Sequence, residues 1–202
     1  AGLECAMQLA RRGYGVTLAE ASGEFGGRVA KESKLSGLAA WGRVMDYRLN
    51  DLSQRSNVQM FTDSELDADQ VKELGLQNVF VATGATWRRD GVGRSALRHR
   101  VWQDERLHNL TPDDILSGKT PPNGPLLIYD DDHVYLASVI AEKLVKDGFK
   151  VIFVTPESLV SSFSVNTLEQ HHVQARLIEL GVQIHCNRTM STHSSHQGTR
   201  SR

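Results

Sequence analysis

The feature that most constrains this chain is a unit of helix, glycine turn and short strand that occurs twice. Residues 6–16 match residues 141–151 in register. The matched pairs are Ala6 and Ala141, Leu9 and Leu144, Gly13 and Gly148, Tyr14 and Phe149, and Val16 and Val151. Any two βαβ units share some of this spacing, so chance similarity is the alternative. The match favours a duplicated α/β scaffold.

Strand-like and helix-like segments alternate along the rest of the chain. Helices are predicted at 1–12, 39–52, 67–74, 111–117, 134–147 and 167–180, and strands at 16–19, 58–61, 78–82, 126–129, 151–154 and 182–185. The run at 78–82 is continuously apolar, which is typical of a buried parallel strand. Strands that alternate with helices of this length indicate βαβ units and a parallel sheet.

Proline and glycine divide the chain in two. Residues 121–125 (PPNGP) form the clearest linker. Shortly before it, Thr111 is the expected N-cap of a short helix with Asp114 at N3, a variant of the capping box. We therefore predict an α/β protein of two Rossmann-like, three-layer domains, at 1–122 and 123–190, the first without its first strand and the second incomplete. A disordered polar tail is expected at 191–202.

Charge and cysteine content exclude several classes of protein. Lys and Arg number 23 and Asp and Glu 24, a formal net charge of −1, which argues against binding to nucleic acid or to anionic membranes. No apolar run approaches the ~18 residues of a membrane span. Only Cys5 and Cys186 occur, which excludes a disulfide scaffold and a cysteine-rich metal cluster held by this chain alone. This usage fits a reducing compartment, and we expect a cytoplasmic protein.

The first copy of the repeat carries residues suited to a nucleotide. Gly2 takes the place of the third glycine of a G-x-G-x-x-G fingerprint, which lets a helix pack closely on a strand; the first two glycines would precede Ala1. Glu20 follows the next strand, where a carboxylate accepts hydrogen bonds from an adenosine ribose. A glycine at a helix start and a glutamate after a strand are both common, so a purely structural role is the alternative.

Two further segments point to the same kind of ligand. Gly26 and Gly27 allow the backbone to approach a flat or phosphorylated ligand closely. Arg28 offers a cation with five donors for phosphate, with an ordinary surface arginine as the alternative. Thr83 and Gly84 come directly after a predicted strand, and ligands of open parallel sheets bind at the carboxyl ends of the strands.

The second copy has lost this nucleotide chemistry. The positions of the three fingerprint glycines and of Glu20 are taken by Asp132, Val134, Ala137 and Thr155. A carboxylate about 4 Å from a phosphate charge costs roughly 4 kcal/mol at an effective dielectric constant near 20. The aspartates at 130–132 look suited to capping the following helix instead. We predict a domain that keeps the NAD(P)-domain fold without binding NAD(P). A merely solvated acidic loop predicts the same. A metal site of Asp130, Asp132 and His133 is the third alternative, disfavoured because three consecutive aspartates cannot all face one ion.

Several segments resemble a known family of flavoproteins. Residues 1–4 (AGLE), 20–28 (EASGEFGGR) and 81–85 (VATGA) look like the FAD/ADP-binding domain of flavoproteins with two dinucleotide folds. Over residues 1–188, the chain resembles the C-terminal half of the trimethylamine dehydrogenase, histamine dehydrogenase and 2,4-dienoyl-CoA reductase family. The amine dehydrogenase branch fits best, at Trp41 and at residues 46–48, 82–87, 110–112 and 166–169.

The resemblance implies a larger enzyme of which this chain is a fragment. A TIM barrel with FMN and a [4Fe–4S] cluster would lie outside the chain, which would then hold no catalytic residue and no metal. FAD or ADP would bind in the first domain. The nucleotide positions that carry over are Ala1, Gly2, Glu20, Arg28, Arg48, Leu66 and Thr83, and Gly27 and Gly84 complete the predicted site. In the dienoyl-CoA reductases, a glutamine resembles the place of Arg28.

Three functions are open at this point. The first is part of an FMN- and iron–sulfur-dependent dehydrogenase of amines or N-methyl compounds, a homo-oligomer at full length, whose electrons pass to an electron-transferring flavoprotein. The second is an NADPH-dependent reductase like the 2,4-dienoyl-CoA reductases, against which Asp132 and Val134 count. The third is a non-catalytic nucleotide-binding docking module. We favour the first.

Overall fold

The structure is a computed structural model that describes residues 1–95 and 108–189. Its contacts form two compact units, Ala1–Thr86 and Trp87–Arg202, which we take in turn. None of the helices within the described residues is long and apolar enough to cross a membrane. The predicted tail at 191–202 lies outside the described residues.

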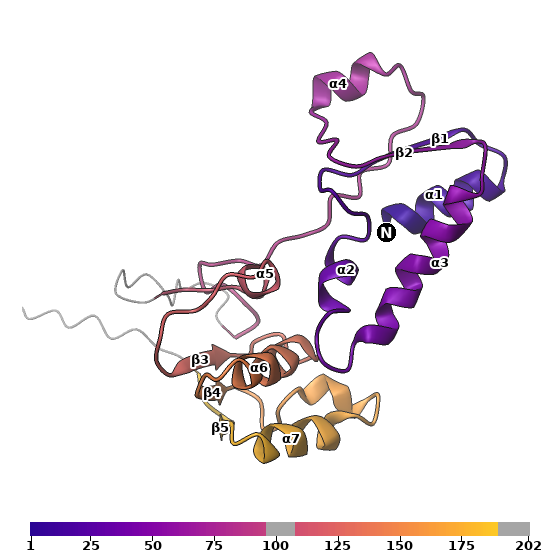
Figure 1. Ribbon diagram of the computed structural model, residues 1–202. Helices are drawn as coiled ribbons and strands as arrows, with labels where there is room; N and C mark the ends of the chain where they lie inside the picture. The colour runs from indigo at the N-terminus through magenta and orange to yellow at the C-terminus, as the bar shows by residue number, and fades with distance from the viewer. Residues whose placement is uncertain (96–107, 190–202) are drawn as a thin grey trace, which may run out of the picture. The chain divides into compact units, whose positions relative to one another are not determined.

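The first unit contains a two-stranded parallel sheet and its helices (Figure 1). Strand β1 pairs with β2 so that Val16 lies opposite Val58 and Ala19 opposite Phe61. The helices and strands predicted within residues 1–74 are confirmed. In chain order the elements are α1 (Gly2–Arg11), β1 (Val16–Ala19), α2 (Arg28–Glu32), the 3₁₀ turn η1 (Ala39–Trp41), α3 (Gly42–Ser53), β2 (Val58–Phe61) and α4 (Ala68–Glu73).

The core of this unit lies between α1, α3 and the two strands. The buried face of α1 has the three- and four-residue spacing of an amphipathic helix, and it meets Leu52 of α3. The buried members are Ala6, Met7, Ala10 and Leu52, with Leu3, Val16, Leu18, Val58 and Met60 packed against them. A turn at Gly13, with φ of +88°, leads from α1 into β1. The start of α1 therefore lies at the same edge of the unit as the carboxyl end of β1.

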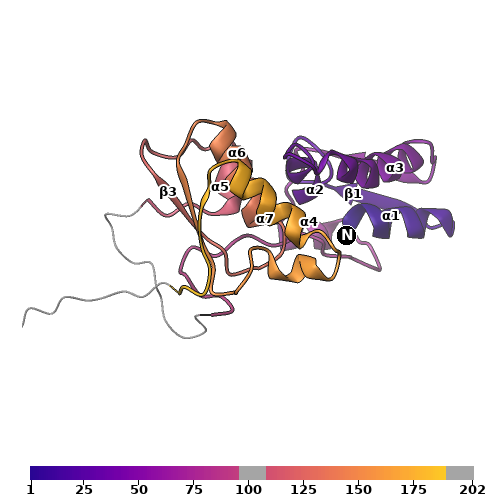
Figure 2. The ribbon, with the colours of Figure 1, turned by 90° about the horizontal axis from the view of Figure 1, so that it is seen from below.

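The second unit contains a three-stranded parallel sheet in the order β3–β4–β5. Leu126 lies opposite Val151, and Ile152 lies opposite Gln183. Helix α6 packs on β3, on β4 and on α7, and the two helices lie beside each other in Figure 2. The elements are α5 (Pro112–Leu116), β3 (Leu126–Tyr129), α6 (Leu136–Lys146), β4 (Val151–Val154), η2 (Ser162–Val165), α7 (Gln170–Glu179) and β5 (Gln183–His185).

The capping box predicted at the start of α5 is confirmed. The Asp114 carboxylate accepts hydrogen bonds from the backbone N–H of Thr111 at 2.9 Å and from its hydroxyl at 3.2 Å. Pro112 occupies the first turn, where its lack of an N–H has no cost. The linker at 121–125 contains no helix or strand.

The strand predicted at 78–82 is wrong. These residues form no strand, and Val79, Phe80 and Val81 are 52%, 63% and 81% exposed. An apolar run becomes a buried strand only where a neighbouring strand satisfies its backbone N–H and C=O groups. In the described part of the chain, β1 pairs with β2 and no strand pairs with 78–82.

The division between the compact units differs from the predicted domain boundary. It falls after Thr86, closer to the N-terminus than the linker at 121–125. The backbone N–H of Trp87 donates to Asp113 at 2.7 Å, and Arg89 pairs with Asp114. These contacts attach residues 87–89 to α5 and so to the second unit. The domain limits at 1–122 and 123–190 stay a prediction.

Candidate functional site: the carboxyl edge of the first sheet

Gly2 lies where the first turn of α1 meets the end of β1. A Cβ built on Gly2 would stand 3.4 Å from the Cβ of Ala82 and 3.8 Å from Cδ1 of Leu18. This glycine therefore borders both β1 and the segment that leads to Thr83 and Gly84. A Cβ at this position would make ordinary van der Waals contacts, so the fingerprint role of Gly2 stays a prediction; Ala1 is exposed beside it.

Glu20 is held at the end of β1 by the loop that it begins. Its Oε1 accepts hydrogen bonds from the backbone N–H of Ser22 at 3.0 Å and from the Ser22 hydroxyl at 2.9 Å. Its backbone N–H donates to Phe61, and its carbonyl accepts from Ser64. The half-buried carboxylate is thus fixed at the carboxyl edge of β1 and β2, the edge at which open parallel sheets bind ligands.

The glycine pair that follows has two different roles. Gly26 has φ of +116°, and a Cβ there would stand 2.2 Å from Sδ of Met45 and 3.1 Å from the Cβ of Ala30. Gly26 is therefore favoured chiefly by its positive φ, and the close approach of Ala30 and Met45 adds to this. Gly27 has φ of +53°, and a Cβ there would meet no atom within 4 Å. The backbone at Gly27 consequently faces open space, as a ligand contact through the main chain requires.

Arg28 joins this loop to the segment after Ala82. Its Nη1 lies 3.2 Å from Oε1 of Glu32, and its Nη2 donates to the carbonyl oxygen of Ala85 at 3.4 Å. The structure therefore brings Arg28 next to the segment that carries Thr83 and Gly84. Those two residues are exposed, and Gly84 has φ of +76°.

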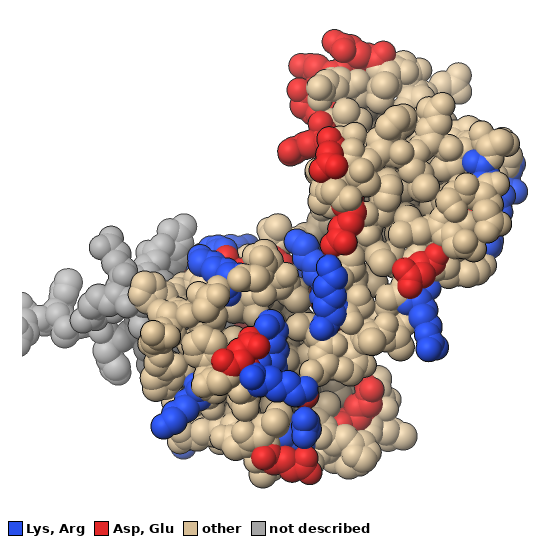
Figure 3. All heavy atoms as spheres, in the orientation of Figure 1, with Lys and Arg blue, Asp and Glu red and all other residues tan. Residues whose placement is uncertain are grey.

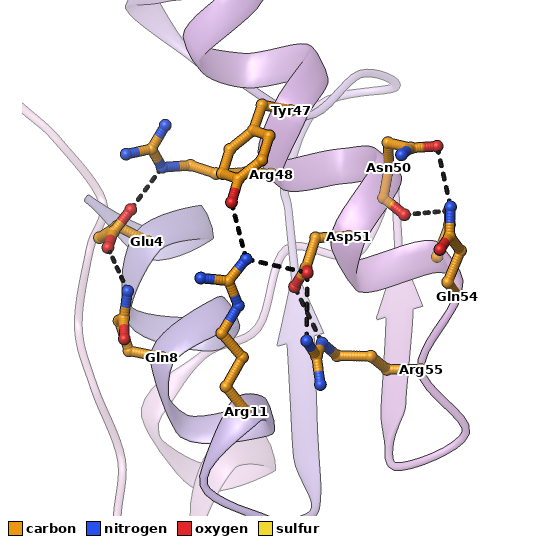
Figure 4. A network of polar contacts seen from close by, with 10 residues as sticks. Glu4, Gln8, Arg11, Tyr47, Arg48, Asn50, Asp51, Gln54 and Arg55 are labelled. Carbon is orange, nitrogen blue, oxygen red and sulfur yellow. Dashed lines mark hydrogen bonds and ion pairs between the residues drawn. The ribbon is translucent and has the colours of Figure 1, made fainter.

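Arg48 of α3 reaches the first turn of α1. Its Nε donates to Oε2 of Glu4 at 2.5 Å, within a network of polar side chains between the two helices (Figure 4). Hydrogen bonds from Gln8 and Arg48 hold the pKa of Glu4 below its usual value. Arg11 bonds both Tyr47 and Asp51 in the same network. The structure thus brings Arg48 to the first turn of α1, where the Glu4 carboxylate pairs its charge.

Leu66 belongs to an acidic segment that follows β2. It is 41% exposed, and Figure 3 shows acidic side chains gathered over the part of the unit that carries α4. The acidic residues of this segment are Asp63, Glu65, Asp67, Asp69 and Glu73. The backbone N–H of Asp63 donates to the carbonyl of Ser22 at 3.0 Å, so the start of the segment runs beside the loop after Glu20.

The equivalent edge of the second sheet is closed by its own side chains. Asp130, directly after β3, is 2% exposed, and its Oδ1 accepts from the backbone N–H groups of Asp132 and His133. Its Oδ2 has no hydrogen-bond partner among the described residues, and burial raises its pKa. The predicted capping of α6 by the aspartates is wrong, since Tyr135 is the N-cap and no side chain caps the helix. Asp130 turns back onto its own loop instead.

Asp131 holds a further segment, residues 93–95, against this loop. Its carboxylate accepts from the backbone N–H and the hydroxyl of Ser95, at 3.1 and 2.5 Å. A Cβ on Gly93 would stand 2.1 Å from an Asp131 oxygen. Glycine at this position thus allows residues 93–95 to lie against Asp131. In the described residues, no group of three or more His, Cys, Asp or Glu could hold a metal ion.

Profiles of two known families match separate parts of the chain. The profile described as "Flavin containing amine oxidoreductase" matches residues 1–46. The profile described as "OYE-like second alpha/beta domain" matches residues 110–197. The first match covers Gly2, Glu20 and Arg28.

Individual proteins extend the match to nearly the whole chain. A dimethylamine dehydrogenase of Hyphomicrobium sp. (strain x) is 32% identical over 190 residues, 91% of this chain and 26% of that protein. Histamine dehydrogenase from Rhizobium sp. 4-9 superposes with a TM-score of 0.90 and 47% identity over 93% of this chain and 29% of its own. The 6-hydroxypseudooxynicotine amine oxidase of Pseudomonas geniculata N1 superposes with a TM-score of 0.91 and 43% identity, over 95% of this chain and 29% of its own.

The chain is homologous to part of the trimethylamine dehydrogenase family. The family is flavin-dependent, and its fold over this part is mixed α/β with parallel sheets. The chain spans between about a quarter and a third of the length of these relatives.

One residue of the site went unnoticed in the sequence. Glu32 is 1% exposed and pairs with Arg28. Its spacing of four from Arg28 within a helix was the available signal. The resemblance pointed only to residues expected to contact a nucleotide, and Glu32 pairs with one of these, Arg28.

Proposed function

We propose that this chain is the nucleotide-binding part of a flavin- and iron–sulfur-dependent oxidoreductase of amines or N-methyl compounds. Its two units would be Rossmann-like, and the first would bind ADP or FAD. The observation that carries the proposal is the gathering of Gly2, Glu20 and Arg28 around the carboxyl edge of β1 and β2, in a chain homologous to amine dehydrogenases. FMN and a [4Fe–4S] cluster, held elsewhere in the complete enzyme, would supply the redox chemistry.

Each part of the site would contact one part of the nucleotide. The Glu20 carboxylate, already oriented by Ser22, would accept hydrogen bonds from the adenosine ribose. The first turn of α1 presents backbone N–H groups that favour a diphosphate. Arg28 would add a charge-assisted hydrogen bond to phosphate oxygen, and the open backbone at Gly27 would allow close approach.

The second unit would bind no nicotinamide coenzyme. Asp131 and Asp132 lie between the end of β3 and the start of α6, where a pyrophosphate would have to approach. Residues 93–95 lie against Asp131. We therefore propose that electrons leave the complete enzyme to an electron-transferring flavoprotein, with the enzyme as a homo-oligomer, and not through NAD(P).

Calorimetric titration of the chain with ADP, FAD, NADH and NADPH tests this proposal. We expect ADP or FAD to bind and both nicotinamide coenzymes to fail. Glu20→Gln should weaken ADP binding by about tenfold, the loss of one hydrogen bond to a charged group. Glu24→Gln, an exposed carboxylate of the same loop, should leave binding unchanged. Tight NADPH binding that persists in Glu20→Gln would overturn the proposal in favour of a pyridine-nucleotide reductase.

A further inference from the structure

Glu32 is a buried carboxylate at the end of α2, beside the proposed nucleotide loop. Its side chain is 2% exposed, and its Oε1 lies 3.2 Å from Nη1 of Arg28. A carboxylate removed from water is costly unless a cation and hydrogen bonds compensate it. Residues four apart in a helix share one face, so Arg28 is placed to compensate Glu32. In turn, Glu32 restricts the positions that the guanidinium can adopt.

Arg28 is anchored on a second side as well. Its Nη2 donates to the carbonyl oxygen of Ala85 at 3.4 Å. A guanidinium is planar, with its donors in a fixed fork, so two anchors from different segments fix its plane. The side chain nevertheless stays 35% exposed. A solute can therefore reach an arginine whose orientation the protein has already set.

The backbone of the loop before Arg28 is open next to this oriented guanidinium. Gly27 precedes the arginine directly, and a side chain there would meet no atom within 4 Å. A side chain at Gly26, in contrast, would meet Sδ of Met45. A phosphate that approaches the backbone of Gly27 would thus come next to the guanidinium that Glu32 holds.

We propose that Glu32 is a positioning residue for the diphosphate of ADP or of the ADP moiety of FAD, and that it acts only through Arg28. This inference rests on the proposed nucleotide binding of the first unit. Without the carboxylate, Arg28 would lose one of its anchors in the free protein, and binding would have to restore the orientation of the guanidinium. Pre-organisation of a long side chain raises affinity by removing this ordering cost.

A double-mutant cycle on ADP affinity tests the inference. Calorimetry would compare the wild-type chain with Arg28→Ala, Glu32→Gln and the double variant. We expect Arg28→Ala to raise Kd by about tenfold or more, from the loss of a charge-assisted contact, and Glu32→Gln to raise it by about threefold to tenfold. The double variant should bind no more weakly than Arg28→Ala alone, because the effect of Glu32 passes through Arg28.

The control is another ion pair with the same helical spacing. Lys143 and Asp147 lie 2.7 Å apart at the end of α6, and Asp147→Asn should leave ADP affinity unchanged. Should Glu32→Gln fail to fold, Glu32→Asp takes its place, since it keeps the charge on a shorter side chain. If Glu32→Asp lowers ADP affinity when Arg28 is present and has no effect in the Arg28→Ala background, the result would again support the inference.

The outcomes separate the inference from the function on which it rests. Failure of the wild-type chain to bind ADP or FAD removes the proposed function, and the inference with it. Wild-type binding that Arg28→Ala weakens and Glu32→Gln leaves unchanged overturns the inference alone. Additive losses in the double variant also overturn it, since Glu32 would then act independently of Arg28.

Discussion

Gly26 lies where the backbone conformation and the neighbouring atoms disfavour any side chain. Its φ of +116° and the 2.2 Å between a built Cβ and Sδ of Met45 mean that alanine would strain the backbone and displace a neighbour. We expect Gly26→Ala to lower the free energy of unfolding by about 1–3 kcal/mol, measured by urea denaturation. Gly15 has no neighbour within 4 Å of a built Cβ, so Gly15→Ala should change stability far less. Equal effects of the two variants would contradict this account.

Asp114 makes the stability of the second unit depend on pH. Hydrogen bonds from Arg89 and from Thr111 hold the pKa of its carboxyl well below the usual value. Because the pKa in the folded state is lowered, the stabilisation is fully present above the unfolded-state pKa of about 3.9 and is lost as pH falls towards the folded-state pKa. The midpoint of thermal unfolding of wild type should therefore exceed that of Asp114→Asn clearly at pH 6 and by less at pH 3, which lies just below the unfolded-state pKa.

The matched control for Asp114 is an exposed aspartate. Asp147 pairs with Lys143 at the surface, where an ion pair is worth little, so Asp147→Asn should show a small difference at both pH values. A difference between wild type and Asp114→Asn that stays constant from pH 6 to pH 3 would show that the carboxylate charge does not stabilise the unit.

Individual site residues were predictable where a glycine or a strand end marked them. The packing of Gly2 on β1 and the place of Glu20 at the end of a strand follow from local sequence. The partners of charged side chains were not predictable, because Glu4, which binds Arg48, is distant from it in the chain. Glu32 was detectable only through its helical spacing from Arg28.

Helix α1 is stabilised mainly by its packing, so we expect Leu52 of α3 to contribute strongly to the stability of the first unit. This side chain is 1% exposed and contacts the buried face of α1. We expect Leu52→Ala to destabilise the unit by about 2–5 kcal/mol and to speed amide hydrogen exchange throughout α1. Leu74→Ala, at a side chain that is 50% exposed, should leave exchange in α1 unchanged. Unchanged exchange of α1 in Leu52→Ala would contradict the assigned core.

Helices and strands were predictable to the extent that their signals are local. Amphipathic spacing, the glycine turns and the capping box at Thr111 each lie within a few residues, and these predictions are confirmed. The run at 78–82 was predicted wrongly because a strand also needs a partner, which sequence spacing does not reveal. The aspartates at 130–132 were assigned as caps of α6, whereas Asp130 bonds the backbone of its own turn.

Across the whole molecule, the carboxyl edges of the two parallel sheets carry different chemistry. The first has Gly2, an open backbone at Gly27 and the cation of Arg28. The second has a buried Asp130 and the clamp of Asp131 on Ser95. The difference in charge and in side-chain bulk explains why we propose nucleotide binding for the first unit alone.

Amide hydrogen exchange of the chain with and without excess ADP tests this difference most directly. The account predicts slower exchange in residues 2–5, 20–28 and 83–86, with no change in residues 130–137. Slower exchange at 130–137 with the first unit unaffected would contradict it.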